Sequence, residues 1–337
     1  MRAAGRWGRT LLGLIVAAAF VFMLTRRVNW SEVERVLAGA DWRLLVVALL
    51  VLSADMGARI TRWWLMLRTL EPTLPLSSCI RPFLASLALN NTVPLRAGDV
   101  VRVFGFRRSL GIPTAHVVGT LVLERLLDLL VLLAILFVCL LGTADVFPRP
   151  FLVGAGLAGG AALIALGVLT VFPGSIAGAL QGLVARVFGS RRWAPAAARG
   201  VAQLTASIGL LRHPDQAARL LGLTLVAWLL EGAVFACVMW SLQLDLGFAA
   251  AGLSLGAGTL ATLLPSSPGY VGTFDYFAAL GLTAYGATPV AATAFALLVH
   301  LVLWVPVTVV GLALLLIWRS GSVPVPLSSQ RLNPDPL

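Results

Sequence analysis

Lysine is absent from this 337-residue chain, so the 25 basic residues behind its formal net charge of +11 are all arginine. Acidic residues are also few, at 14, and charged residues make up only 12% of the chain against 59% hydrophobic residues. The mean hydropathy is +0.94. Such a composition leaves too little polar surface to cover a water-soluble fold. It therefore predicts an integral membrane protein.

Cysteine is scarce, and its placement excludes a disulfide framework. Cys79, Cys139 and Cys237 lie in or beside apolar segments, without a CxxC pair and without an even count. We interpret them as small hydrophobic residues and expect no metal and no cofactor. No histidine has a nucleophile and an acid beside it, so no catalytic triad is predicted, and His300 is interpreted as a core residue with a satisfied hydrogen bond.

Six apolar segments are long enough to cross a bilayer, which takes about 20 helical residues for about 30 Å. Two further apolar segments, about 77–109 and about 249–285, are broken at their centres and predict pairs of half-helices, as re-entrant hairpins or short spans. The predicted fold is an all-α, polytopic transmembrane helical bundle over residues 1–320, with a disordered tail over 321–337. The six full spans centre on Leu11–Leu24, Leu44–Leu65, Val117–Leu141, Phe151–Phe172, Leu220–Leu242 and Val290–Trp318.

The two breaks resemble each other. The front break runs from Asn90 to Asp99 and the back break from Leu264 to Asp275, and each places a proline four residues before a glycine, followed by an acid. In lipid, broken helices persist only where the freed backbone groups are buried in protein or line a wet cavity. Paired breaks in the two halves of a chain are typical of transporters. We therefore predict an inverted repeat whose breaks meet near the membrane midplane.

Eight charged residues fall at predicted membrane depth, where each would cost about 2.5–3.5 kcal/mol if it faced lipid. They are expected to face the bundle interior, as structural ion pairs or as functional groups. Glu231 has no local partner, so it requires a distant arginine or a proton. The acids that follow the breaks are expected to bind a cationic part of a substrate or a coupling proton. The eight are Asp55 with Arg59 and Glu124 with Asp128, each pair at i, i+4 spacing, together with Arg125, Asp99, Glu231 and Asp275.

The breaks also leave half-helix amino termini, after Gly98 and around Gly272, whose N–H groups suit a phosphate or carboxylate. Arg96 and Arg102 are placed to add charge-assisted contacts to the same anion. We expect a polar cavity, open to one leaflet, lined by Asp99, Arg96, Glu124, Arg125 and Asp275. The residues predicted to bind or couple are Asn91, Pro94, Arg96, Gly98, Asp99, Arg102, Glu124, Arg125, Asp128, Pro265, Pro268, Gly269, Gly272 and Asp275.

Arginine bias predicts the orientation, with both termini in the cytoplasm of a bacterial cell and the chain in its cytoplasmic (inner) membrane. This topology assigns Arg62 and Arg68 to the inside, makes residues 26–41 an interfacial helix, and lays residues 173–214 on the inner leaflet. The basic charge indicates anionic or zwitterionic membrane lipids as partners, because no groove-reading helix or RNA-binding motif suggests nucleic acid.

Four motifs, in this order, resemble the lysylphosphatidylglycerol synthase transmembrane region, or flippase-like domain, over residues 41–319. Relatives commonly have glutamate at the positions of Asp99 and Asp275. The resemblance implies that the chain moves a phospholipid or lipid-linked molecule between leaflets and is not itself an enzyme; some relatives add a soluble aminoacyl-transferase domain, which we do not expect here. The motifs are Arg59-Ile60-Thr61-Arg62-Trp63-Trp64, Pro94-Leu95-Arg96-Ala97-Gly98-Asp99 with Arg102, Glu124-Arg125-Leu126-Leu127-Asp128, and Pro265-Ser266-Ser267-Pro268-Gly269 with Gly272 and Asp275.

Two alternatives stay open. The chain could be a non-transporting membrane partner of a lipid-synthesis enzyme. It could also be a polyprenyl-phosphate-dependent glycosyltransferase that uses acids of the first external loop, Glu32, Glu34 and Asp41, although the sequence has no DxD metal-binding pair.

Overall fold

The computed structural model describes residues 2–26, 28–93, 96–141, 148–188, 201, 209–264 and 267–320. Within these ranges the chain forms α-helices and two short 3-10 helices, and no strand occurs among them. The all-α prediction is confirmed. The tail over 321–337 lies outside the described residues, as do Pro94 and Pro265.

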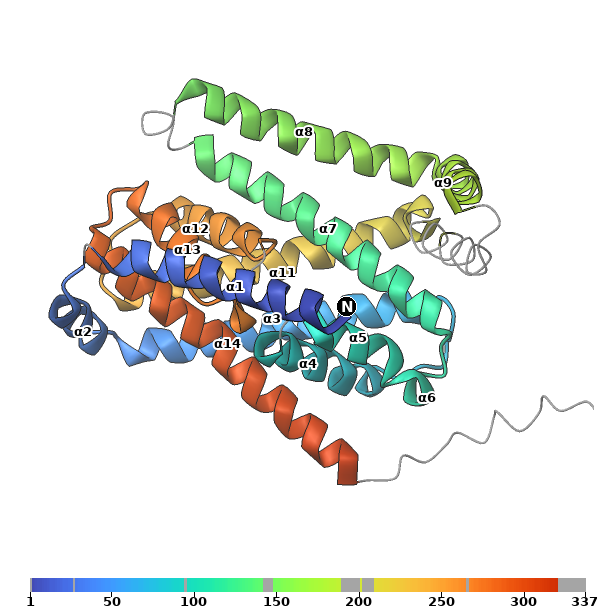
Figure 1. The fold of residues 1–337 in the computed structure, drawn as a ribbon, viewed down its shortest axis with the longest axis horizontal. Coiled ribbons are helices and arrows are strands. Elements are labelled where there is room, and N and C mark those ends of the chain that lie inside the picture. Colours follow the sequence, from blue (N-terminus) through green and yellow to red (C-terminus); the bar gives the residue numbers. More distant parts are fainter. Residues whose placement is uncertain are drawn as a thin grey trace, which may run out of the picture.

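Each of the six predicted spans is a helix (Figure 1). Among the described residues, α3, α11 and α14 are long and apolar enough to cross a membrane by length and composition. Helix α7 is 28 residues long but carries three charged side chains, at positions 124, 125 and 128. The six are α1 (Arg2–Thr25), α3 (Trp42–Arg68), α7 (Thr114–Leu141), α8 (Arg149–Val171), α11 (Pro214–Ser241) and α14 (Pro289–Ser320).

Both broken segments form pairs of short helices that pack on one another, as the sequence predicts. The first pair is α4 (Ser77–Thr92) with α5 (Ala97–Phe104), and the second is α12 (Phe248–Ala261) with α13 (Thr273–Thr283), joined through the 3-10 helix η3 (Pro268–Tyr270). Figure 1 shows the two pairs toward opposite ends of the bundle.

Each helix pair packs against a long helix of the other half of the chain. Helix α4 packs against α14, α12 packs against α7, and α3 packs against α11. This exchange of partners is what an inverted repeat would produce, although the two-fold relation and the re-entrant character of the pairs stay predictions.

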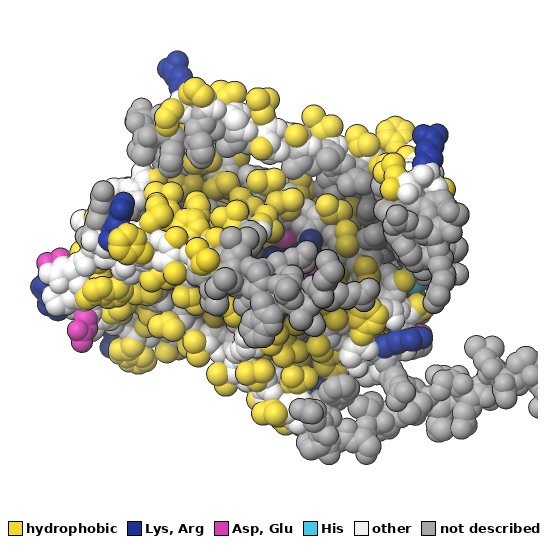
Figure 2. All heavy atoms as spheres, in the orientation of Figure 1, with side chains coloured by type: hydrophobic (Ala, Val, Ile, Leu, Met, Phe, Trp, Pro, Cys, Tyr) yellow, Lys and Arg dark blue, Asp and Glu magenta, His cyan; other side chains and the backbone are white. Residues whose placement is uncertain are grey.

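Hydrophobic side chains cover most of the outer surface that is drawn by type in Figure 2. Leu50, Leu157 and Ile164 are exposed to 66%, 70% and 69%. An apolar surface of this kind suits the hydrocarbon core of a bilayer, where only helices and closed barrels satisfy their backbone groups. Charged side chains lie mainly toward the ends of this view, and a few lie in a hollow near its centre.

Three short helices complete the described chain. Helix α2 (Trp30–Ala38) falls in the predicted interfacial segment and begins at Asn29, whose side chain accepts a hydrogen bond from the Ser31 N–H. Helices α6 (Arg107–Leu110) and α9 (Pro173–Phe188) follow α5 and α8. Of the predicted inner-leaflet segment, residues 189–200 and 202–208 lie outside the described residues, and Gly209–Arg212 forms the 3-10 helix η2.

Candidate functional site

A cavity of about 740 Å³ lies where the two helix breaks meet. Its walls come from α3, α4, α5, α7, α11, α12, η3 and α14, and its volume is in the range of small-molecule binding sites. The cavity is unusual for an apolar bundle because side chains of both charges line it. Its main polar lining residues are Asp55, Arg59, Asn90, Asn91, Arg96, Asp99, Arg125, Asp128, Glu231, Thr259, Thr262 and Tyr270.

The outer part of the cavity is apolar. Val100, Phe104 and Leu263 line the cavity and are 56%, 65% and 63% exposed. Two of the acidic lining residues lie deeper: Asp55 is 0% exposed and Asp128 6%. The cavity therefore combines buried charges with an exposed apolar rim.

The two breaks contact each other directly. Arg96 Nε donates to the Tyr270 hydroxyl at 3.2 Å. A Cβ on Gly269 would lie 3.3 Å from the Asn91 carbonyl oxygen, so the backbones also touch. The predicted approach of the two motifs is confirmed.

Backbone strain marks the same contact. Arg96 has φ +52° and Tyr270 has φ +61°, and they are two of three non-glycine residues with positive φ in the described part of the chain. A bulky residue in this region is unusual, and such outliers cluster at functional sites. Here the strained backbone on both sides brings the guanidinium of Arg96 and the ring of Tyr270 together at the cavity wall.

Gly98 and Asn90 fix the position of Asp99. A Cβ on Gly98 would lie 1.8 Å from the Ser86 carbonyl oxygen, so only glycine allows α5 to pack this closely on α4. The Asn90 side chain donates to Asp99 Oδ1 at 3.0 Å and accepts from the Asp99 N–H at 3.3 Å. The first turn of α5 is thereby bound to α4, which differs from the expectation that this N–H is free for a phosphate.

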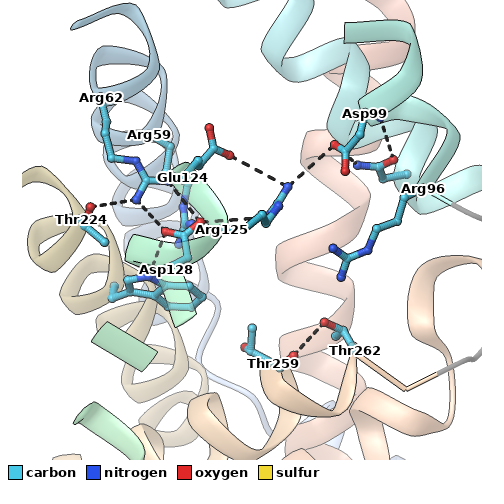
Figure 3. A network of polar contacts seen from close by, with 12 residues as sticks. Arg59, Arg62, Arg96, Asp99, Glu124, Arg125, Asp128, Thr224, Thr259 and Thr262 are labelled. Carbon is cyan, nitrogen blue, oxygen red and sulfur yellow. Dashed lines mark hydrogen bonds and ion pairs between the residues drawn. The ribbon is translucent and has the colours of Figure 1, made fainter. Parts of the chain in front are cut away.

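Two arginines face the cavity without a hydrogen bond to an acid. Arg125 is 44% exposed and lies 3.8 Å from Asp99 Oδ1, with Glu124 and Asp128 at 4.0 Å, beyond hydrogen-bond distance. Arg96 has no acid within ion-pair distance among the described residues. Figure 3 shows both side chains reaching into the space between the helices. Both cations are therefore placed to bind an anion.

Arg62 and Asp128 form a closed pair on one side of the cavity. Arg62 donates to both carboxylate oxygens, at 2.6 and 3.2 Å, and to the Thr224 hydroxyl at 3.0 Å. The Trp228 indole also donates to Asp128 Oδ1, at 3.2 Å. Arg62 is 0% exposed. It therefore neutralises an acid inside the bundle instead of standing free in a loop, and its position on the cytoplasmic side stays a prediction.

Arg102 and Glu124 form a second closed pair, outside the cavity lining. The two side chains meet at 3.0 and 3.4 Å and are 1% and 3% exposed. The Arg102 guanidinium lies over the rings of Trp63 and Phe83, at 3.8 and 4.5 Å. Both residues were expected at the anion site. The structure differs because the two side chains bind each other in the protein interior, away from the cavity.

Asp55, Arg59 and Glu231 form a three-residue cluster that opens on the cavity. The i, i+4 contact predicted from the sequence is present, with Arg59 Nε donating to Asp55 Oδ1 at 2.8 Å. The other end of the guanidinium contacts Glu231 Oε2 at 2.5 Å. The distant arginine that Glu231 was expected to require is therefore Arg59.

Asp275 lies outside the cavity, which differs from the sequence expectation. Its Oδ2 accepts the Gly272 N–H at 2.8 Å, and its Oδ1 lies 2.6 Å from His300 Nδ1. Helix α1 covers this break, because a Cβ on Gly272 would lie 2.6 Å from the Ala17 carbonyl oxygen. The amino terminus of α13 is thus closed by its own acid and by α1. His300 has a hydrogen-bond partner, as predicted.

Sequence reasoning missed Tyr270 and the role of Arg62 in the bundle. Tyr270 lies between Gly269 and Gly272, which were both predicted to belong to the site, so its position in the motif could have identified it as a site residue. Arg62 follows Arg59 by three residues, a spacing that places both on one helix face. The partners of both residues lie on distant segments, which spacing does not reveal.

The sequence of this chain matches a known protein family. The model of the lysylphosphatidylglycerol synthase TM region matches residues 10–311. The chain is also similar to the glycosyltransferase AglD of Haloferax volcanii, with 27% identity over 320 residues, covering 86% of this chain and 51% of that protein. The chain therefore spans about half the length of this relative. Since the family model covers most of the chain, the protein belongs to the lysylphosphatidylglycerol synthase transmembrane region family.

Proposed function

We propose that this protein moves the head group of a phospholipid or lipid-linked molecule between the two leaflets, through the cavity at the helix breaks. The observation that carries the proposal is the cavity itself, with charges of both signs inside and exposed Val100, Phe104 and Leu263 at its rim. An amphipathic ligand matches this division. The protein supplies a path and performs no chemistry on its cargo.

The physical need is the cost of a charged head group in hydrocarbon, which is several kcal/mol for each ionised group. The cavity replaces water around the head group by fixed polar side chains, while the acyl chains stay in the bilayer beyond the apolar rim. A groove of this kind lowers the free-energy barrier to moving the head group across the membrane, and it does not need to enclose the whole lipid.

The phosphate of the lipid docks between Arg96 and Arg125, the two cavity arginines that form no hydrogen bond to an acid. Both guanidinium groups can form charge-assisted hydrogen bonds with phosphate oxygens. Asp99, 3.8 Å from Arg125, is placed to meet a cationic part of a zwitterionic head group. The proposed location is the bacterial cytoplasmic membrane, and the arginine distribution supports an orientation with both termini inside.

The test is transport in proteoliposomes. The purified protein is reconstituted with phosphatidylglycerol or phosphatidylethanolamine labelled on an acyl chain, and a membrane-impermeant quencher reports the lipid that reaches the outer leaflet. One charge-assisted hydrogen bond is worth about 1.5–3 kcal/mol, so Arg96→Gln and Arg125→Gln should each slow transport about ten- to a hundredfold. Arg219→Gln removes an exposed arginine of α11 and is the matched control.

Wild-type rates in both cavity variants would contradict this function.

A second candidate function rests on the relative that is named a glycosyltransferase: the half that the two proteins share would handle a lipid-linked substrate for an enzyme. In that case the pure wild-type protein would move no lipid, yet it would bind lipid phosphate through Arg96 and Arg125 and stimulate a lipid-modifying enzyme when the two are reconstituted together.

A further inference from the structure

Two carboxylates share one guanidinium where α3 and α11 face the cavity. Arg59 bonds Asp55 at 2.8 Å and Glu231 at 2.5 Å, and its guanidinium carbon lies 4.6 Å from the centre of the Trp228 ring. The two acids are 0% and 14% exposed at their side chains. One positive charge balances only one of them, and an uncompensated carboxylate is costly at this depth.

Among the described residues, the ion pairs of Asp55 and Glu231 are with Arg59 alone. Helix α7 contributes Asp128, which is a further acid, and α3 contributes Arg62, which is occupied by that acid at 2.6 and 3.2 Å. Arg125 of α7 reaches Asp128 only at 4.0 Å. The cavity-lining residues of α12, of the turn that follows it and of α14 carry no charge; they include Thr259, Leu260, Thr262, Leu303, Trp304 and Val307. His300 of α14 contacts Asp275 instead.

One atom of the cluster has no partner. Asp55 Oδ2 is buried and makes no hydrogen bond to the described residues. An ionised oxygen in this situation would bear a full desolvation cost, which a proton removes. A metal ion or a substrate ammonium would need room and several further ligands at this oxygen, and the buried atom offers neither.

We propose that Asp55 and Glu231 together hold one exchangeable proton, and that uptake of this proton is linked to binding of an anionic lipid phosphate at Arg96 and Arg125. The second half of the statement rests on the proposed function, whereas the proton site itself rests only on the cluster. Its ligand is the proton, and Arg59 is the fixed counter-charge.

The linkage follows from charge. A phosphate brings a negative charge into the cavity that already holds the two acids, and protonation of one acid reduces the repulsion. Because binding free energies are reciprocal, the proton then strengthens anion binding by the same factor by which the anion strengthens protonation. The anion should bind more tightly at low pH, and its affinity should fall by up to about tenfold per pH unit as the proton is lost.

The proton site is tested by infrared difference spectroscopy on the full chain in lipid nanodiscs, recorded between about pH 6 and about pH 9, where ordinary carboxyl groups, with pKa values near about 4, are already ionised. The wild type should show the carbonyl stretch of a protonated carboxylic acid that disappears at alkaline pH. Asp55→Asn and Glu231→Gln should each remove this band, because an amide cannot hold the acidic proton. Asp245→Asn changes an exposed acid and should leave the band in place. A band that survives in both cluster variants, or that is absent from the wild type at every pH, would overturn the proposal.

The linkage is tested by calorimetric titration with dihexanoyl phosphatidylglycerol, whose phosphodiester keeps its single charge at every pH of the titration. Experiments in two buffers of different ionisation enthalpy count the protons taken up. The wild type and Asp245→Asn should take up protons on binding and weaken with rising pH. Glu231→Gln and Asp55→Asn should bind without proton uptake and with a flat pH profile. Binding by the wild type without proton uptake, or a dependence on sodium instead of pH, would refute the linkage.

The two experiments separate the two ideas. If the probe does not bind the wild type at any pH, the proposed function and the linkage both fail, while the carboxyl band still decides the proton site. If the probe binds and requires Arg96, yet the band is missing, the proton site fails and the anion site stands.

Discussion

Breaking the buried Arg102–Glu124 pair should destabilise the protein strongly, because neither charge has access to water. Replacing Glu124 with alanine leaves the guanidinium, 1% exposed, without an acid between the rings of Trp63 and Phe83. Loss of one member of a buried pair costs about 3–5 kcal/mol. The cation–π contacts, worth about 0.5–2 kcal/mol, persist and place the loss in the lower half of that range.

The reverse change should cost less. In Arg102→Met the carboxylate of Glu124 keeps Arg125 at 4.0 Å, so it is not left alone. The double variant Arg102→Met with Glu124→Leu removes both charges and keeps similar volume, so its stability should return to within about 1 kcal/mol of the wild type. Arg125→Gln, one residue along the same helix but 44% exposed, is the matched control and should cost under about 1 kcal/mol.

The assay is equilibrium unfolding of the detergent-solubilised protein, followed by tryptophan fluorescence across a denaturant series. Among the variants, the double variant should be the most stable, Arg102→Met should be less stable, and Glu124→Ala should be the least stable. If Glu124→Ala lost less than about 1 kcal/mol, or if the double variant were as unstable as the worse single variant, a buried and mutually neutralised pair would be the wrong description of these two residues.

Two further predictions concern the helix breaks. Gly98→Ala forces a Cβ to within 1.8 Å of the Ser86 backbone oxygen, so α5 must move away from α4. Unfolding in the same assay should show a loss of several kcal/mol. The control Gly57→Ala, whose Cβ would have nothing within 4 Å, should be neutral or slightly stabilising. Asp275→Ala leaves the Gly272 N–H and His300 without their acceptor, so it should lower the free energy of unfolding by about 1–3 kcal/mol. Asp275→Asn keeps one acceptor oxygen. It should preserve lipid transport in proteoliposomes, since residue 275 lies outside the cavity. Loss of transport in a well-folded Asp275→Asn variant would contradict that placement.

The sequence predicts the helices of this protein well because their signal is local. Runs of about 20 apolar residues and the Pro–Gly breaks are properties of short windows, and the structure has a helix or a break at each of them. The meeting of the two breaks was also predictable, because freed backbone groups in lipid require protein or water around them.

The pairing of the charges could not be predicted in the same way. Glu124 and Asp128 share a helix face, yet one binds Arg102 of α5 and the other binds Arg62 of α3. Which arginine reaches which acid depends on helix packing and rotation, and sequence spacing carries neither. The same reason explains Asp275, whose place after a break suggested a cavity residue although α1 closes that side.

The contact between α1 and the second break has a consequence for the order of assembly during synthesis. Ala17 and Val21 of α1 lie against Gly272, and the Phe20 ring packs at a tilt against Tyr276 and Phe277, at 5.2 and 5.4 Å between ring centres. About 255 residues separate Ala17 from Gly272 along the chain (272 minus 17). At about 5–20 residues per second, the first helix waits roughly 13–50 s before its partner leaves the ribosome. During that interval the apolar face of α1 that later covers the break is exposed to lipid or to the insertion machinery, and α1 closes over α13 only once nearly the whole bundle has been made.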